Sequence, residues 1–586
     1  MGWPYEFLKQ SNEELAHRRS IIDLYGQIAH ISSIAPLLIA ALVRLAIYAA
    51  RFISKGGSSS SSGSRVQYQE VPGSPAVKAR RASAAGGLAA SWRKLVWWLG
   101  DDVTAFGSSW GQRDEWILGL AWTTWLMALS VRGTGRDYMH VTKRFGIVGI
   151  SQLPVQYLLS LKSLNPYAWA FNSSHEHLNR YHRVLGRIVY GLLLFHIVLY
   201  NNFFLQNSIW MSRFFKPVIF MGHLLAFSFH SLAGTAMASL RRYSYRLFFI
   251  THLTVALYVP ALVFFHATSA RIYVVEAAVV FIFDLAARKM GTVTTPSTVE
   301  TISGTDLVKV SVPLPAEKAE KFRSLPGSHI YLNIPPTGRT AKHPSSKSLV
   351  FDFLYNPFTV ASVKEDNSGI AFVARRRNGP MTNVLNDFAS PSSSGETKVS
   401  LAIEGPYGEM GKHFQNLLTW SPTRILLVAG GVGATFTVPL YHAIQTDLPA
   451  AKIQFVWAIR TPGDATWAIS TGDDKKLLED ENVQLYLTGD LGLANDADNA
   501  AGAGTTTVEL DAMFRDSRRG RFTSEHNRKR PDIQKIVDDA FRQGLQDKVA
   551  VLVCGPTEMT WEVRRHVRPW VMKGRDVWWH NESFGW

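Results

Sequence analysis

Residues 182–196 read HRVLGRIVYGLLLFH, and residues 252–266 read HLTVALYVPALVFFH. Each apolar stretch begins and ends with a histidine, and in both the two histidines are fourteen residues apart. Fourteen residues advance an α-helix by about 21 Å and return to within roughly 40° of the same face. If the two stretches are parallel helices, His182 faces His252 at one level and His196 faces His266 at the other.

Facing imidazoles are the arrangement by which a helix bundle holds a haem iron from both sides, and the separation of the levels leaves room for two haems. A structural zinc site would need four ligands, and no cysteine or carboxylate joins either level. Isolated polar contacts between helices are the third interpretation, which suits one histidine better than two matched pairs. His223 and His230 share a face but lack a partner helix with a matching pair, so we expect them to pack or to contact the edge of a cofactor.

The histidine stretches lie in a half of the chain that alternates apolar runs with short polar breaks. Spanning a membrane takes about 20 apolar residues. We predict about seven spans, with six as the alternative, since the second and third runs are short; the runs are residues 31–50, 116–131, 145–161, 184–204, 217–240, 247–265 and 272–287. No comparable run follows Thr292, so the second half is expected to be soluble.

The 586 residues include 62 Lys and Arg against 46 Asp and Glu, a formal net charge of +16. Such a balance suits nucleic-acid binding, but basic residues also gather in membrane-protein loops that stay inside. They do so in residues 51–113 and 241–246, which predicts that the soluble half is inside and the N-terminus outside. The link that contains Arg132, Arg136, Lys143 and Arg144 disagrees with this orientation. The first run is expected to be a retained anchor, not a signal peptide.

Two segments rich in small residues, 55–91 and 492–532, are predicted to be flexible loops. The chain has one cysteine, Cys554. A single cysteine excludes a disulfide framework and any zinc or iron–sulfur site built from cysteines alone.

Residues 292–410 predict short strands broken by proline and glycine turns, which is typical of a β-barrel. The expected strands are residues 298–312, 329–334, 353–363, 370–376 and 398–403. The stretch YNPFT at 355–359 combines a ring, a proline and a hydroxyl, the groups that a flavin needs. The stretch RRRNGPMT at 375–382 has the charge to hold a pyrophosphate, although an arginine run is as often a solvated surface.

The last part of the chain alternates strands with helices, which predicts a parallel α/β sheet. The apolar strand 424–429 is followed by GGVGAT at 430–435, where glycines let backbone N–H groups approach a phosphate at a helix N-terminus. Strand 453–459 ends at Arg460, and a basic residue there favours the 2′-phosphate of NADP. Strand 549–553 runs into Cys554-Gly555-Pro556.

Taken in this order, the paired histidines, YNPFT, GGVGAT, CGP and the aromatic C-terminus resemble the fungal ferric-chelate reductases of the ferric reductase and NADPH oxidase superfamily, over about residues 116–586. The resemblance implies a polytopic α-helical membrane bundle followed by a ferredoxin-reductase-like module, made of an antiparallel β-barrel FAD domain and a parallel α/β NADPH domain. The domains would be residues 1–113 (anchor span and loop), 114–290 (haem domain), 291–415 (FAD) and 416–586 (NADPH).

The resemblance also implies the cofactors, namely FAD, NADPH and two b-type haems, and it assigns residues to them. The haem ligands would be His182, His196, His252 and His266. The flavin residues would be Asn356, Pro357, Phe358, Thr359, Arg377 and Thr382, although the family motif has histidine where Asn356 stands. The nucleotide residues would be Gly430, Gly431, Gly433, Thr435, Arg460, Cys554, Gly555 and Pro556. Phe584, which matches the aromatic residue that covers the flavin ring, and Cys554 would be catalytic.

By the same resemblance, electrons pass from cytosolic NADPH through FAD, the inner haem and the outer haem to extracellular Fe(III) or Cu(II) chelates. A superoxide-generating NADPH oxidase shares the internal motifs, and a transporter with a regulatory nucleotide domain is a more distant alternative. The implied partners are the chelates, the lipid bilayer and an iron permease, without nucleic acid. The implied location is the plasma membrane with the C-terminal half in the cytosol; the sequence leaves the oligomeric state open.

Overall fold

The computed structural model describes residues 4–56, 84–105, 108–302, 304–339, 351–352, 354–377, 379–389, 398–468, 477, 480–489, 529–544 and 547–582. The predicted loop residues 57–83, most of the predicted insert 492–532, and Phe584 lie outside these ranges. Contacts divide the chain into two compact units. The first contains residues 1–65 and 99–290, and the second contains residues 66–98 and 291–586.

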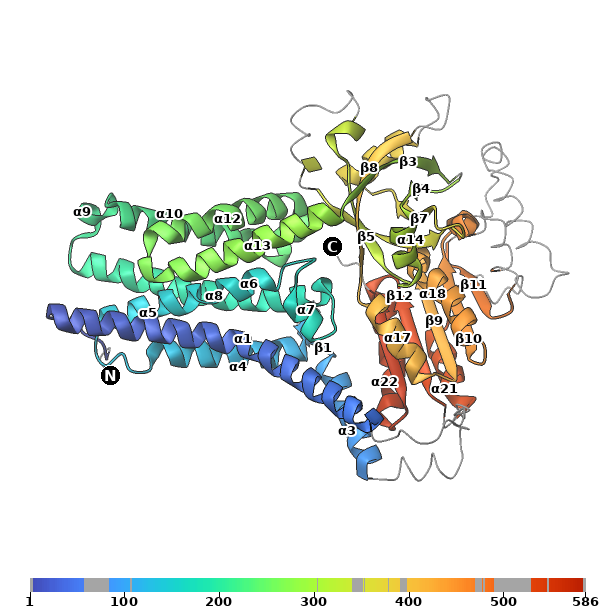
Figure 1. Ribbon diagram of the computed structural model, residues 1–586, viewed down its shortest axis with the longest axis horizontal. Coiled ribbons are helices and arrows are strands. Elements are labelled where there is room, and N and C mark those ends of the chain that lie inside the picture. The colour runs from blue at the N-terminus through green and yellow to red at the C-terminus, as the bar shows by residue number, and fades with distance from the viewer. Residues whose placement is uncertain are drawn as a thin grey trace. The chain divides into compact units, whose positions relative to one another are not determined.

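The first unit is built from helices, and Figure 1 shows the long ones lying side by side along one direction. They are α1 (Asn12–Gly56), α4 (Arg113–Val131), α5 (Tyr138–Ile150), α8 (His175–Gln206), α10 (Pro217–Thr235), α12 (Tyr245–His266) and α13 (Arg271–Gly291). Short helices complete the unit: α6 (Leu153–Leu158), α7 (Pro166–Ala170), α9 (Trp210–Phe214) and α11 (Ala238–Tyr243).

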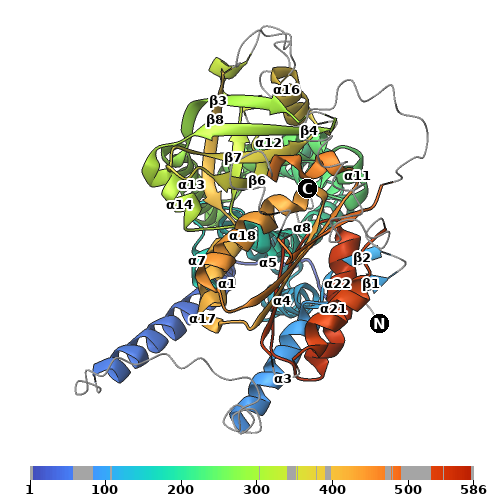
Figure 2. The ribbon, with the colours of Figure 1, turned by 90° about the vertical axis from the view of Figure 1, so that its right-hand side faces the viewer.

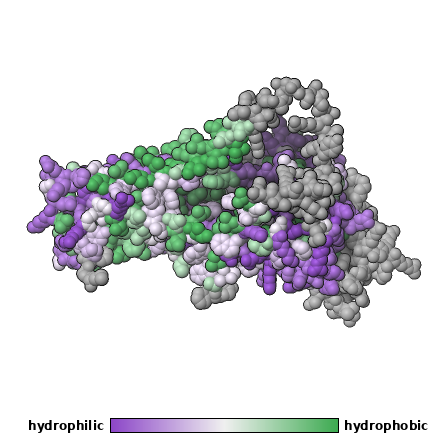
Figure 3. Space-filling model, turned by 90° about the horizontal axis from the view of Figure 1, so that it is seen from below, coloured by the Kyte–Doolittle hydropathy of each residue, from purple (hydrophilic) through white to green (hydrophobic). Residues whose placement is uncertain are grey.

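The surface of this unit is apolar where a water-soluble bundle would be polar. Apolar side chains gather on the face of the unit seen in Figure 3, and Leu42 and Phe283 are both more than 60% exposed. Within the described residues, four helices are long and apolar enough to cross a membrane: 12–50, 175–206, 217–235 and 245–266. Lipid is the solvent that makes such a surface stable.

The three other predicted spans have different outcomes. Residues 116–131 lie in α4 and residues 272–287 lie in α13, each a single helix. The run 145–161 is not one helix, because the chain turns at Ser151 and Gln152 between α5 and α6. Pro154 lies in the first turn of α6, where its missing N–H group costs nothing. The Gln152 side chain at this break has a partner inside the bundle, because its amide donates to the Ala29 carbonyl over 3.0 Å.

The segment of basic residues that contradicted the predicted orientation is only partly a loop between helices. Lys143 and Arg144 lie inside α5. Arg144 is fully buried; it donates to the Leu129 carbonyl over 3.1 Å, and its guanidinium lies 3.7 Å from the ring centre of Tyr25. The positive-inside rule concerns loops, so this arginine carries no weight in the assignment of orientation.

The second unit begins with a closed antiparallel barrel in the strand order β3-β4-β7-β6-β5-β8. Its strands are β3 (Val293–Thr301), β4 (Leu307–Pro313), β5 (His329–Asn333), β6 (Asn356–Val363), β7 (Gly369–Arg375) and β8 (Lys398–Tyr407). The predicted strand 298–312 is wrong, because β3 and β4 form a hairpin around residues 302–306. The helices α14 (Ala316–Arg323) and α16 (Pro380–Phe388) flank the barrel and pack on its core.

A five-stranded parallel sheet follows, in the order β11-β10-β9-β12-β13. Its strands are β9 (Arg424–Gly430), β10 (Lys452–Ile459), β11 (Val483–Leu487), β12 (Val549–Cys554) and β13 (Val577–Glu582). Successive strand residues alternate between two cores. One core includes α17 (Met410–Trp420) and α18 (Ala434–Asp447), the other α21 (Ile533–Arg542) and α22 (Thr557–Met572), so helices cover both faces (Figure 2). This confirms the predicted architecture.

One helix from the N-terminal part of the chain also belongs to the second unit. Helix α3 (Ala84–Leu99) includes residues 84–91, which we expected to be loop. Its Trp97 is buried in the core formed with α21 and α22, and the rings of Trp97 and Trp579 meet edge to face at 5.4 Å. A segment near residue 97 is therefore part of the nucleotide-binding half.

Trp97→Ala should weaken the second unit, because removing a buried tryptophan costs about 3–5 kcal/mol. Pulse proteolysis of the full-length protein in urea measures this as a lower urea concentration for half cleavage of the unit. Trp561→Ala is the matched control, since that side chain is 45% exposed. Equal effects of the two substitutions would contradict the packing role of Trp97.

Candidate functional site

The four repeated histidines are carried by α8 and α12. The rings of His182 and His252 lie 6.0 Å apart between centroids, with their planes at 60°. His196 and His266 lie fourteen residues farther along the same two helices. The structure therefore brings the first predicted pair together within the bundle, with the two rings edge to face.

Backbone carbonyls from other helices or helix ends hold three of these imidazoles. Nδ1 of His182 lies 2.9 Å from the Gln156 carbonyl, Nδ1 of His196 lies 2.8 Å from that of Thr142, and Nδ1 of His266 lies 2.8 Å from that of Val218. A carbonyl can only accept, so Nδ1 must carry the proton and Nε2 keeps its lone pair. This is the support that metal-binding histidines usually receive. Nδ1 of His252 is buried with no bonding partner among the described residues.

Two glycines make room for the histidines of the second level. A Cβ atom on Gly146 would lie 2.7 Å from Nδ1 of His196, and one on Gly222 would lie 2.9 Å from Cε1 of His266. Both distances are too short for real contacts, so any side chain at these positions would displace an imidazole. The sequence analysis did not identify these glycines, because glycine is common inside membrane helices.

The neighbouring histidines are held differently. Nδ1 of His223 donates to the Ile219 carbonyl over 2.8 Å, and Nδ1 of His230 to the Ala226 carbonyl over 2.6 Å, both within their own helix. His223 packs against the ring of Phe214 with centroids 4.5 Å apart. These contacts agree with the predicted packing role.

The predicted flavin motif opens β6, where Pro357 pairs with Tyr331 and Thr359 pairs with His329 on β5. Phe358 points the other way and stacks on Phe372 at 5.1 Å, against the barrel core. Its ring therefore stabilises the barrel. Asn356 and Pro357 are partly exposed, whereas Thr359 is buried beside His329.

An aromatic cluster that the sequence analysis missed lies beside this motif. The rings of Tyr331 and Tyr407 are 5.4 Å apart, and the ring of His329 is 5.6 Å from that of Tyr331. Gly405 and Gly408 flank Tyr407 with positive φ angles, and a Cβ on Gly408 would lie 3.3 Å from Nδ1 of His329. The signal in the sequence was the GPYG stretch at 405–408, with a glycine at each end.

The arginine run divides into two roles. Arg376 and Arg377 are exposed, and the hydroxyl of Thr382 donates to the Arg377 carbonyl over 2.7 Å, which shapes the turn before α16. Arg375 forms an ion pair with Asp464 at 2.9 Å. Its guanidinium lies 3.7 Å from where a Cβ on Gly431 would stand. Thus Arg375, which we did not single out, is the arginine that reaches the glycine-rich loop.

The glycine-rich loop and the Cys554-Gly555-Pro556 turn meet at the carboxyl ends of β9 and β12. The chain proceeds from β9 to β10 and β11 on one side and returns to β12 on the other, so this is the switch point of the sheet, where α/β folds bind ligands. A Cβ on Gly430 would lie 2.6 Å from Cδ of Pro556. A Cβ on Gly433 would collide with the carbonyl oxygen of Cys554. Only glycines allow the two turns to approach this closely.

Other predicted nucleotide residues surround this point. Arg460 is exposed directly after β10, and its backbone N–H donates to Asp464 over 3.3 Å. The hydroxyl of Thr435 donates to the Val432 carbonyl over 2.8 Å and so caps the loop. Burial, with the nearby carboxylate of Glu582 as a second cause, raises the pKa of the Cys554 thiol. The thiol therefore stays protonated near neutral pH and is a poor nucleophile.

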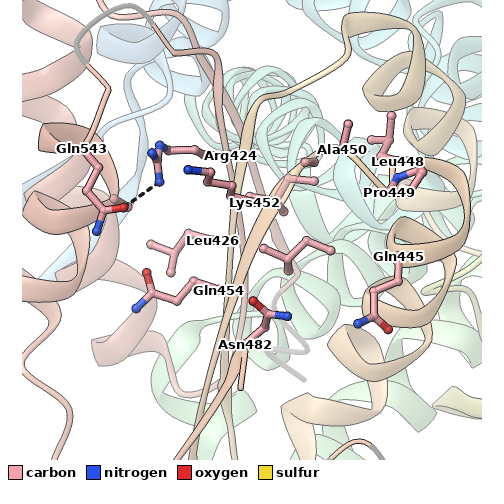
Figure 4. Close-up of a pocket in the computed structure, with 14 residues that line it drawn as sticks. Arg424, Leu426, Gln445, Leu448, Pro449, Ala450, Lys452, Gln454, Asn482 and Gln543 are labelled. Atoms are coloured by element: carbon pink, nitrogen blue, oxygen red, sulfur yellow. Dashed lines mark hydrogen bonds between the residues drawn. The ribbon is translucent and has the colours of Figure 1, made fainter. Parts of the chain in front are cut away.

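A cavity of about 570 Å³ lies elsewhere on the sheet. Figure 4 shows Arg424, Lys452 and Gln454 among its lining residues. Arg424 and Lys452 begin β9 and β10, so the cavity is at the amino ends of the strands, opposite the glycine-rich loop. It is not part of the nucleotide site.

One carboxylate and two imidazoles converge among the described residues of the second unit. Ligand atoms of Glu409, His413 and His580 lie within 4.8 Å of one another, a set that can hold a divalent cation. However, Nε2 of His580 already lies 3.1 Å from the Glu582 carboxylate, and its ring stacks on Phe436 at 5.7 Å. These contacts account for its position without a metal.

Three family profiles match the chain. The ferric reductase like transmembrane component matches residues 145–276, an FAD-binding domain matches residues 293–411, and the ferric reductase NAD binding domain matches residues 423–568. The matched segments contain both histidine pairs, the Asn356–Thr359 motif and both nucleotide turns.

Curated relatives are similar over most of the chain. The ferric/cupric reductase transmembrane component 2 of Schizosaccharomyces pombe is 23% identical, over 76% of this chain and 80% of that protein. The probable metalloreductase AIM14 of Meyerozyma guilliermondii is 24% identical, over 74% and 83%. Among solved structures, the ferredoxin reductase in carbazole 1,9a-dioxygenase is 14% identical, over 50% and 69%, with a TM-score of 0.29.

Gly433→Ala should weaken nucleotide binding strongly, because the new methyl group forces the glycine-rich loop away from the Cys554 turn. We expect at least a tenfold rise in the Kd for a reduced nicotinamide nucleotide, measured by fluorescence titration of the purified protein. Gly87→Ala is the control for a glycine substitution far from the loop, since this residue lies in helix α3 and no atom lies within 4 Å of a Cβ there. An unchanged Kd in Gly433→Ala would contradict the assignment of this loop.

Proposed function

Since the chain carries the transmembrane, FAD-binding and NAD-binding domains of the ferric reductases, we propose that it is an NADPH-driven reductase of ferric or cupric chelates. The balanced reaction is NADPH plus two Fe(III), which gives NADP⁺, one proton and two Fe(II). The observation that carries the proposal is the close approach of His182 and His252, whose ring centroids are 6.0 Å apart in a chain that also has flavin and nucleotide domains. A transporter would need neither feature.

The four histidines suit two b-type haems. Three of them have Nδ1 bonded to a carbonyl, which leaves Nε2 as the metal-binding atom, and Gly146 and Gly222 leave space for the rings. His182 and His252 would hold one haem, and His196 and His266 the other. When bound, the haems and FAD supply the conversion of a two-electron hydride into single electrons and their passage across the bilayer. The protein sets the geometry of that chain through these imidazoles.

In the second unit, the residues of the switch point would bind the nucleotide. Backbone N–H groups of Gly430–Gly433 would hold the pyrophosphate at the start of α18, and Arg460 would bind the 2′-phosphate of NADPH. Asn356, Pro357, Thr359, Arg377 and Thr382 would bind the flavin. Cys554, as a neutral buried thiol beside the nicotinamide, would position the ring without attacking it. Phe584 would cover the flavin.

The direction of electron flow follows from the basic loops. We propose that the second unit is cytosolic and that the acceptor is outside, at the plasma membrane. An electron that leaves a negative interior gains about 2.3 kcal/mol per 100 mV, so outward transfer is favourable. Names of the curated relatives favour metal chelates over oxygen as acceptor. An iron permease would then take up the product.

The proposal predicts a b-type haem spectrum in the detergent-purified protein, reducible by dithionite and by NADPH under anaerobic conditions. His182→Ala and His196→Ala should each lose about half of the haem, because each removes one ligand of one pair. His230→Ala is the matched control, since this histidine is bonded within its own helix. Absence of haem from the unmodified protein would refute the electron path. Superoxide as the main product in air would make the protein an oxidase.

Arg460→Ala should lower the preference for NADPH over NADH by about tenfold or more, since a hydrogen bond to a charged group contributes about 1.5–3 kcal/mol. Steady-state kcat/KM values with the two nucleotides and a ferric chelate measure the ratio. Lys452→Ala removes a basic residue from the other end of the same strand and should leave the ratio unchanged. An unaltered ratio in Arg460→Ala would place NADP recognition elsewhere.

A further inference from the structure

Helix α3 has one face that the second unit uses. Trp97 is buried there, its carbonyl accepts a hydrogen bond from Arg564 over 3.0 Å, and the guanidinium of Arg564 lies 4.4 Å from the centre of its ring. Arg93, one turn earlier, forms an ion pair with Asp576 at 3.5 Å. This face holds α3 against α22 and the start of the last strand.

The opposite face of α3 is apolar and, in the part of the chain that the structure describes, exposed. Leu88, Trp92, Leu95 and Val96 are 73%, 64%, 44% and 49% exposed. Their spacing of four, three and one residues places them on one side of a helix, and the centre of that side is about 150° around the helix from Trp97. A helix on a water-soluble domain would present charged residues there. We call these four residues the α3 stripe.

The chain that follows α3 indicates what covers the α3 stripe. Only Gly100 separates the end of α3 from Asp101. Asp101 accepts a hydrogen bond from the backbone N–H of Arg113 over 3.1 Å, and its carboxylate pairs with the Arg113 side chain at 3.3 Å. Arg113 is the first residue of α4, a helix of the membrane bundle. The C-terminal end of α3 is therefore joined through Asp101 to the first residue of α4, the helix that contains the predicted span 116–131. The start of a span is the level of the lipid headgroups.

We propose that α3 is an interfacial helix, with the α3 stripe resting in the headgroup region of the protein's own membrane while Trp97 and Arg93 hold the nucleotide-binding sheet. Amphipathic helices with tryptophan at the apolar boundary bind membranes in this way. The helix has sixteen residues, too few to span the bilayer.

Spin labels test the proposal in the full-length protein, reconstituted in nanodiscs of phosphatidylcholine and phosphatidylserine. Leu95→Cys and Leu88→Cys place a label on the α3 stripe, and Lys94→Cys places one on the adjacent flank of the same helix. The native Cys554 is 2% exposed and its thiol pKa is raised, so it should not react; the unmodified protein checks this. Power saturation then compares collisions with oxygen, which enters lipid, and with a water-soluble nickel chelate.

We expect the ratio of oxygen to nickel collisions to be several-fold higher at residues 88 and 95 than at residue 94. Equal ratios at all three positions would overturn the proposal, because the α3 stripe would then face water. Low collision rates with both reagents at 88 and 95 would also overturn it, because a second protein surface would cover the stripe. The measurement needs no electron transfer, so it is independent of the proposed reaction.

Discussion

The positions of the membrane-embedded imidazoles depend on hydrogen bonds to backbone carbonyls, since a polar group in lipid must find its partner in the protein. The carbonyls come from α5, from α6 and from the start of α10, so three parts of the bundle converge on the two helices that carry the histidines. The break between α5 and α6 matters for His182, because Gln156 lies in the last turn of the short helix α6, where backbone carbonyls lack a partner within the helix. An unbroken helix over 145–161 would place its carbonyls along one axis, each already bonded to its own ladder.

In the second unit, the structure depends on a steric constraint between the glycine-rich loop and the Cys554-Gly555-Pro556 turn. The switch point of the parallel sheet brings two turns so close together that a side chain on Gly430 or Gly433 would collide with the other turn. Arg375 and Asp464 then link the end of the barrel strand β7 to the segment after β10. The flavin motif and the nucleotide turns are thus held within one packed unit, a condition for hydride transfer over a short distance.

Several predictions succeeded because they depended on local pattern alone. The strands β9, β10 and β12 are continuous apolar runs that end in functional turns, and such runs occur almost only in buried parallel sheets. Others failed where a distant contact decided the result. Residues 298–312 alternate well enough for one strand, yet Gly304 supplies a positive φ for a hairpin turn. Residues 84–91 are rich in alanine and glycine, a composition typical of linkers. They are nevertheless helical, because the packing of Trp97 stabilises the helix to which they belong.

The sequence by itself determined the order of the membrane, barrel and sheet regions, the spacing that pairs His182 with His252, and the glycines of the nucleotide turn. Periodicity, length and backbone freedom are properties of consecutive residues, so they can be read without the fold. Only the tertiary structure decided which ring nitrogen is free in three of the four histidines, that Arg375 reaches the glycine-rich loop while Arg377 is exposed, and that Arg144 is buried against Tyr25. Those outcomes depend on carbonyls, carboxylates and rings contributed from far along the chain, and hydrogen bonds and packing act between neighbours in space.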